Sequence, residues 1–185
     1  MEYEEDRLLW KNLKGGDRTS LNAIFVKYYD VLLTFANAYI TLNDAEEVVA
    51  DIFFLLWSKR DQIEINLSLK VYLYKATKNR CLNVIKQRKD HSKLLDKVVH
   101  YELQCNDIQP DEMMIYQQTK NQLDDLINKL PKQCRIIFLL SRNDGLSHLE
   151  ISKILNISPN TVNTQVYRAI KYLKSRISFL DCTIM

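Results

Sequence analysis

The chain has 185 residues, of which 46% are hydrophobic and 26% charged, and it contains only three glycines and three prolines. This composition excludes a wholly disordered chain. The shortage of glycine and proline argues against sandwiches, barrels and Gly-rich phosphate loops, and favours helices. The apolar runs are too short for a membrane helix of roughly 20 residues, and the N-terminus (MEYEED) is acidic, unlike a signal peptide. We therefore expect a cytoplasmic, all-α protein without direct membrane insertion.

The four cysteines are widely scattered, at positions 81, 105, 134 and 182. Zinc sites usually show C-x-x-C pairs or closely spaced histidines, and these cysteines form no such pair and have no histidine doublet nearby. The pattern predicts reduced thiols, no metal site and no cofactor; a zinc site assembled from distant residues is the alternative.

Charge is distributed in blocks. Residues 1–58 carry 5 Lys/Arg against 10 Asp/Glu, and residues 59–89 carry 9 against 2. Residues 90–130 carry 4 against 8, and residues 131–178 carry 8 against 2. Two basic segments separated by an acidic one indicate two phosphate-facing surfaces. Simple solvated faces would give the same blocks.

Helical periodicity predicts four helices in the N-terminal half, over about 5–14, 18–40, 44–59 and 69–89. Gly15-Gly16 is expected to stop the first helix. Asp17 or Thr19 is expected to cap the second. Asn43 or Asp44 would begin the third, with Asp44 and Glu47 at capping-box spacing. Residues 60–67 predict a loop, after which Ser68 would cap the fourth helix.

Residues 90–112 lose this periodicity and predict a linker, and helical pattern resumes over about 111–130. We therefore expect two small helical domains, over residues 1–89 and 113–185, joined by that linker.

The sharpest local pattern lies near the C-terminus. Ser147 and Glu150 stand at capping-box spacing and predict a helix start. Residues 156–158 predict a tight turn, in which Ile157 would fill the angle between two helices. Ser158 is a natural cap with Pro159 at the first position of the next helix. Two short helices joined by a three-residue turn form a helix-turn-helix. The side chains expected to be buried are Leu149, Ile151, Ile154 and Leu155 on the first helix, and Val162, Val166, Ala169, Ile170 and Leu173 on the second.

The second of these helices carries short polar residues off its buried stripe, where a solvated helix would usually carry Glu and Lys. Asn, Gln and Arg match the edges of adenine and guanine in the major groove, and the basic residues that follow suit phosphate contacts. The pattern predicts a recognition helix; an ordinary helical hairpin is the alternative. The predicted duplex-binding residues are Asn160, Thr161, Asn163, Thr164, Gln165, Arg168 and Lys171.

Two N-terminal helices also have unusual faces. The helix over 44–57 has more apolar residues than one core face needs, because Phe54 and Leu55 add to it; it is either central in a bundle or docks on a partner. The helix over 69–89 interleaves aromatic residues with cations, which suits single-stranded nucleic acid. Its alternative is that Tyr72 and Tyr74 are core aromatics.

The chain resembles the extracytoplasmic-function sigma factors of the sigma-70 family, the small two-domain class of bacterial transcription initiation factors. The segment DAEEVVADIFFLLW at 44–57 is similar to the family's DAEDVVQEVFLRLW signature, and LKVYLYKATKNR at 69–80 is similar to LKAWLFRIARN. Gly16-Asp17 with the aromatic residues that follow resembles the family's opening stretch, and residues 130–174 resemble its C-terminal DNA-binding region.

The resemblance implies an initiation factor without catalysis of its own. It implies that the apolar helix over 44–57 docks on the beta-prime clamp of core RNA polymerase, through Glu47, Asp51, Phe54 and Leu55. The loop over 60–67 and the helix over 69–89 would hold the melted minus-ten strand. The residues implied are Arg60, Ile63, Asn66, Lys70, Tyr72, Lys75, Asn79 and Arg80. The helix-turn-helix would bind the minus-thirty-five duplex. Further implied partners are the beta flap of the polymerase, promoter DNA and an anti-sigma factor.

Two departures from the family pattern limit what can be transferred. Ala50-Asp51 stands where Gln-Glu is frequent, and Asn163-Thr164-Gln165 stands where Lys-Ser-Arg is frequent. The second change favours base contacts over phosphate contacts, so promoter preference does not carry over. The alternative function is a helix-turn-helix regulator with an N-terminal dimerisation or sensing domain.

Overall fold

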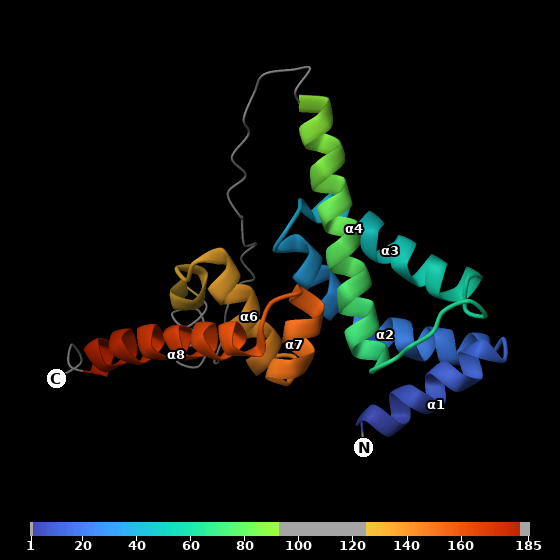
Figure 1. Cartoon of the computed structure of the whole chain (residues 1–185), viewed down its shortest axis with the longest axis horizontal. Coiled ribbons are helices and arrows are strands. Elements are labelled where there is room, and N and C mark those ends of the chain that lie inside the picture. Colours follow the sequence, from blue (N-terminus) through green and yellow to red (C-terminus); the bar gives the residue numbers. More distant parts are fainter. Residues whose placement is uncertain (1, 93–124, 182–185) are drawn as a thin grey trace, which may run out of the picture. The chain divides into compact units, whose positions relative to one another are not determined.

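The computed structural model describes residues 2–92 and 125–181, and these residues form helices and connecting segments without any strand (Figure 1). The all-α prediction is therefore confirmed. The chain divides into two compact units, one N-terminal and one C-terminal. Within the described ranges, no helix is both long and apolar enough to cross a membrane. The predicted linker lies outside the described residues from position 93 onward, as does the predicted helix over 111–130 up to position 124.

The N-terminal unit contains four helices: α1 (Glu2–Lys14), α2 (Arg18–Asn37), α3 (Leu42–Ser58) and α4 (Leu69–Ser92). Helix α2 packs against the other three. The core is built from the apolar stripes of these helices, and its largest fully buried side chains include Leu13, Ile24, Tyr28, Leu32, Leu56, Leu73 and Tyr74.

Helix α1 ends at Lys14, directly before Gly15-Gly16, as predicted. Gly16 has a φ of 88°, which a residue with a side chain adopts only with strain. Asp17 caps α2 by accepting hydrogen bonds from the backbone N–H groups of Thr19 (3.0 Å) and Ser20 (3.1 Å). The hydroxyl groups of Ser20 and Thr19 also donate to this carboxylate, and together these bonds lower the pKa of Asp17 to about 2.

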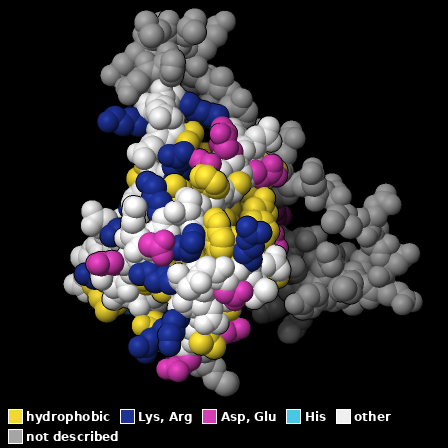
Figure 2. Space-filling view, turned by 90° about the vertical axis from the view of Figure 1, so that its right-hand side faces the viewer, with side chains coloured by type: hydrophobic (Ala, Val, Ile, Leu, Met, Phe, Trp, Pro, Cys, Tyr) yellow, Lys and Arg dark blue, Asp and Glu magenta, His cyan; other side chains and the backbone are white. Residues whose placement is uncertain are grey.

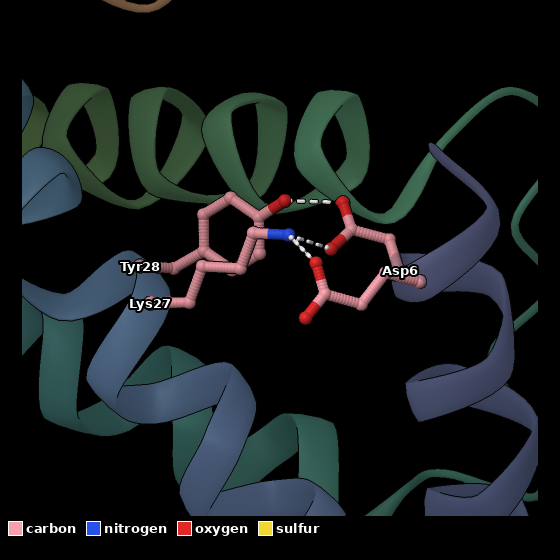
Figure 3. A network of polar contacts seen from close by, with 4 residues as sticks. Asp6, Lys27 and Tyr28 are labelled. Atoms are coloured by element: carbon pink, nitrogen blue, oxygen red, sulfur yellow. Dashed lines mark hydrogen bonds and ion pairs between the residues drawn. The ribbon is translucent and has the colours of Figure 1, made fainter. Parts of the chain in front are cut away.

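A buried carboxylate ties α1 to α2 (Figure 3). Asp6 accepts a hydrogen bond from the Tyr28 hydroxyl and an ion-pair contact of 2.7 Å from Lys27 Nζ, which also lies 3.1 Å from Glu5. Burial alone would lower the pKa of Lys27, but the hydrogen bonds with Asp6 and Glu5 outweigh it and raise that pKa. The network satisfies the charge of Asp6 inside the unit, as a buried carboxylate requires.

The predicted start of α3 is wrong. Thr41, not Asn43 or Asp44, is the N-cap: its backbone is extended, with φ −66° and ψ 159°, and Leu42 is already helical. The Thr41 hydroxyl accepts from the backbone N–H of Asp44 and donates to the Asp44 carboxylate. Asp44 therefore stands three residues inside the capping motif, where a carboxylate also favours the helix dipole. At α4 the prediction is confirmed, because Ser68 Oγ accepts from the backbone N–H of Val71 at 3.1 Å.

The C-terminal half of the chain contains a helical turn at residues 125–128, followed by α6 (Lys132–Arg142), α7 (His148–Leu155) and α8 (Pro159–Asp181). Helices α6 and α8 pack together. One cluster of buried side chains between them consists of Leu130, Cys134, Phe138, Ala169 and Leu173.

Candidate nucleic-acid and polymerase interfaces

Helices α7 and α8 have the local geometry of a helix-turn-helix. The capping box at α7 is confirmed: Ser147 N–H donates to the Glu150 carboxylate at 2.9 Å, and Glu150 N–H donates to Ser147 Oγ at 3.3 Å. In the turn, Asn156 adopts a φ of 56°, a conformation that Asn tolerates better than most residues. Ser158 Oγ then accepts from the N–H of Thr161 at 3.0 Å and caps α8, as predicted.

Leu149 is a wrong prediction on α7. It is 57% exposed, whereas Ile151 and Ile154 are buried and Leu155 is half-buried. Ile151 and Ile154 are three residues apart and define the buried face of α7. At 100° per residue, Leu149 lies about 200° around the helix from Ile151, so its side chain points outward.

Helix α8 separates its two faces cleanly. Its buried side chains recur at the helical period and are Val162, Val166, Ala169 and Leu173, while Ile170 is half-buried. The predicted duplex-binding residues lie off this stripe. Asn160, Asn163, Thr164, Arg168 and Lys171 are exposed, and Thr161 and Gln165 are partly exposed.

Two hydroxyls on this face already have partners. Thr164 Oγ1 donates to the Asn160 carbonyl at 2.9 Å, and Thr161 Oγ1 shares a hydrogen bond of 2.9 Å with Ser158 Oγ. The amide and guanidinium groups of Asn163 and Arg168 are therefore better placed than these hydroxyls to contact base edges.

Helix α8 has an additional exposed residue that the sequence reasoning missed. Tyr167 is 64% exposed. It stands four residues after Asn163 and four before Lys171, so the three side chains share one side of the helix. That i, i+4 spacing from two predicted contacts was the signal that could have identified it.

In the N-terminal unit, α3 exposes part of its apolar surface. Phe54 is 68% exposed while its neighbour Phe53 is only 5% exposed, and Leu55 is half-buried. Glu47, which stands seven residues before Phe54, is also exposed. Figure 2 shows hydrophobic side chains at the surface among acidic and basic ones on one face of the molecule. Of the two alternatives for this helix, docking on a partner is favoured by the exposure of Phe54.

Helix α4 divides its aromatic residues between core and surface. Tyr74 is fully buried and its ring meets that of Phe35 edge to face at 5.0 Å, so the core alternative is correct for Tyr74. Tyr72 is half-buried, and burial raises its pKa. Among the predicted cations and amides of this helix, Lys75, Asn79 and Arg80 are exposed and Lys70 is partly exposed.

The loop over 60–67 has one residue held in place and others at the surface. The Arg60 guanidinium lies over the Trp57 ring at 4.6 Å and donates to the Trp57 carbonyl at 2.9 Å. Ile63 is half-buried and Asn66 is exposed. Arg60 thus stabilises the end of α3, and a contact with DNA would compete with that packing.

Comparisons with known proteins agree on one family. Residues 120–173 match the family model for sigma-70, region 4. The chain is 24% identical over 175 residues to the ECF RNA polymerase sigma factor SigW of Bacillus subtilis, covering 90% of this chain and 94% of SigW. It is 22% identical over 183 residues to the ECF RNA polymerase sigma-E factor of Escherichia coli K12, covering 95% and 96%. The chain is thus similar over nearly its whole length to extracytoplasmic-function sigma factors, and its C-terminal part matches region 4 of the sigma-70 family.

Two solved structures share the fold of this chain. One is RpoE of Bartonella quintana in complex with the anti-sigma factor NepR, with a TM-score of 0.65 and 20% identity, covering 85% of this chain and 96% of that one. The other is CnrH in complex with the cytosolic domain of CnrY, with a TM-score of 0.61 and 16% identity, covering 94% and 97%.

Proposed function

We propose that this chain is an extracytoplasmic-function sigma factor, which binds core RNA polymerase and directs it to specific promoters. In this proposal α8 enters the major groove of the minus-thirty-five element through the seven residues predicted above. The loop over 60–67 and α4 hold the melted minus-ten strand, and the exposed side of α3 around Phe54 binds the beta-prime clamp. The activity is binding, not catalysis, and we expect it in the cytoplasm, where promoters and polymerase meet.

The observation that carries the proposal is the exposed face of α8. Residues 151–180 contain no Asp or Glu, and the exposed residues of α8 combine amides with Arg168 and Lys171. A helix face without acidic residues is well suited to a polyanion, because no like charge opposes the phosphates. The amides add groups that distinguish base pairs, which a purely electrostatic surface would lack.

Two further partners belong to the proposal. The beta flap of the polymerase would bind the C-terminal unit, as the resemblance implies for this family. An anti-sigma factor would cover these surfaces, since both structural neighbours were solved with such a partner or with a cytosolic domain bound.

The decisive experiment is reconstitution of the purified chain with core polymerase. We expect co-elution with core on gel filtration, and transcription from a cognate promoter only when the chain is added. Run-off transcription on fragmented genomic DNA would identify that promoter from the transcripts themselves. A chain that binds duplex DNA alone as a dimer and does not co-elute with core would instead be a helix-turn-helix regulator.

A further inference from the structure

Helices α3 and α4 face each other with complementary charges. Asp51 on α3 forms an ion pair of 2.6 Å with Arg80 on α4, and Asp44 forms one with Arg88. Seven residues separate the two acids and eight separate the two arginines, which corresponds to about 10.5 Å and about 12 Å of helix. The two helices are therefore antiparallel here, and their charges are in register along a groove of about 930 Å³.

Glu47 occupies the position between the two pairs. It follows Asp44 by three residues and precedes Asp51 by four, so all three acids share one side of α3. In the same register, the residue opposite Glu47 is Val84, which also lines the groove. Within the part of the chain that the structure describes, Glu47 has no ion-pair partner. Among the described residues that line the groove there are thus two paired acids and one acid without an ion-pair partner.

The Asp51–Arg80 pair joins two residues that the proposed function assigns to different partners. Asp51 belongs to the polymerase-binding side of α3, whereas Arg80 belongs to the strand-binding side of α4. Neither group can engage its partner fully while it is bound to the other. We propose that the Asp51–Arg80 pair couples polymerase binding to strand capture, because both partners must displace the same contact.

The coupling has a definite sign. The partner that binds first must break the Asp51–Arg80 ion pair, and the free energy of breaking it lowers that partner's affinity. The second partner then binds a side chain that is already free of the ion pair. Each partner therefore increases the affinity for the other, by the same factor in both directions. In the free sigma factor the closed pair lowers the affinity of Arg80 for isolated strands, which limits unproductive binding before the polymerase is engaged.

The expected size is modest. The side chains of Asp51 and Arg80 are 41% and 47% exposed, and exposed ion pairs of this kind correspond to a factor of about 1.5 to 5 in an equilibrium constant. Salt should weaken the coupling, since both groups are open to counterions.

The test compares charge-matched variants of the full-length chain. The probe is a single-stranded DNA of about 20 nucleotides and mixed sequence, titrated at low salt, because an Arg80–phosphate contact does not depend on base identity. Asp51→Asn and Glu47→Gln each remove one negative charge from the same groove, but only Asp51→Asn opens a pair. We expect Asp51→Asn to tighten strand binding about 1.5- to 5-fold more than Glu47→Gln does. In an Arg80→Gln background that excess should disappear.

The reciprocal arm measures affinity for core polymerase. Arg80→Gln should tighten core binding relative to Lys86→Gln, which removes an equal charge from the same groove. Melting temperatures of all variants separate these effects from misfolding. Equal strand affinities for Asp51→Asn and Glu47→Gln would overturn the coupling and leave the proposed function intact. If the unmodified chain does not bind the strand and Arg80→Gln changes nothing, the strand-binding role of α4 itself fails, and the coupling, which rests on it, fails with it.

Discussion

Phe54 offers the sharpest test of the proposed polymerase surface, because its neighbour Phe53 provides an internal comparison. Full burial of a Phe side chain stabilises by about 1.5–3 kcal/mol. Phe54 is 68% exposed in the free chain, so Phe54→Ala should cost about 0.5–1 kcal/mol of folding free energy. If the exposed two thirds of the Phe54 side chain is buried on the clamp, Phe54→Ala should reduce the binding free energy by about 1–2 kcal/mol. That corresponds to a roughly 5- to 30-fold weaker affinity for core polymerase.

The assay pairs two measurements on each variant: fluorescence anisotropy of the labelled chain titrated with core polymerase, and thermal unfolding. Phe53 is only 5% exposed, so Phe53→Ala should cost about 3–5 kcal/mol of stability. Leu8 on α1 is 59% exposed and lies outside the proposed surface, so Leu8→Ala should leave core affinity within about twofold of the unmodified chain. Unchanged core affinity in Phe54→Ala, or a loss of stability as large as that of Phe53→Ala, would refute the assignment.

Substitutions at three other residues test separate parts of the molecule. Arg168→Ala should weaken binding to the promoter duplex by about 1–3 kcal/mol without changing core affinity; equal losses in gel-shift and core-binding assays would indicate misfolding instead. Tyr167→Ala should weaken duplex binding while Tyr167→Phe retains most of it if the ring makes an apolar contact, for example with a thymine methyl; replacing thymines by uracil in the duplex should then mimic Tyr167→Ala at one position. Asp17→Ala should lower the melting temperature at about pH 6, because the native pKa of Asp17 is lowered from 3.8 to about 2. The stabilisation is fully present above about pH 4 and is lost as the pH falls toward about 2, so the difference in melting temperature should vanish near that lower pH.

Local signals explain most of what the sequence predicted correctly. A cap needs only residues within one turn of each other, and Asp17, Ser68, Ser147 and Ser158 are all recognisable as caps from their immediate neighbours in the sequence. The error at α3 has the same local origin. The sequence analysis considered only Asn43 and Asp44, whereas Thr41 two residues earlier has the extended backbone of a cap and is the residue that caps the helix.

Side-chain partners across helices could not be predicted in this way. Tyr74 and Tyr72 look alike in the sequence, and only the position of Phe35 shows that Tyr74 belongs to the core. Leu149 is one of several apolar residues on α7, but it lies about 200° around the helix from the buried Ile151 and is therefore exposed. Arg60 was expected at the DNA, and its packing on Trp57 depends on how the chain leaves α3.

The two basic segments differ in how much of their charge is free to act. The sequence contrasts residues 1–58 with residues 59–89 as an acidic and a basic block, yet Asp51–Arg80 and Asp44–Arg88 join these blocks and neutralise part of each. Helix α8, in contrast, has no acidic residue of its own over positions 159–180. Net charge per segment therefore overstates the positive potential at α4 and represents α8 more faithfully. Long-range attraction to DNA depends on uncompensated charge, so duplex binding by α8 should be more sensitive to salt, per cation, than strand binding by α4.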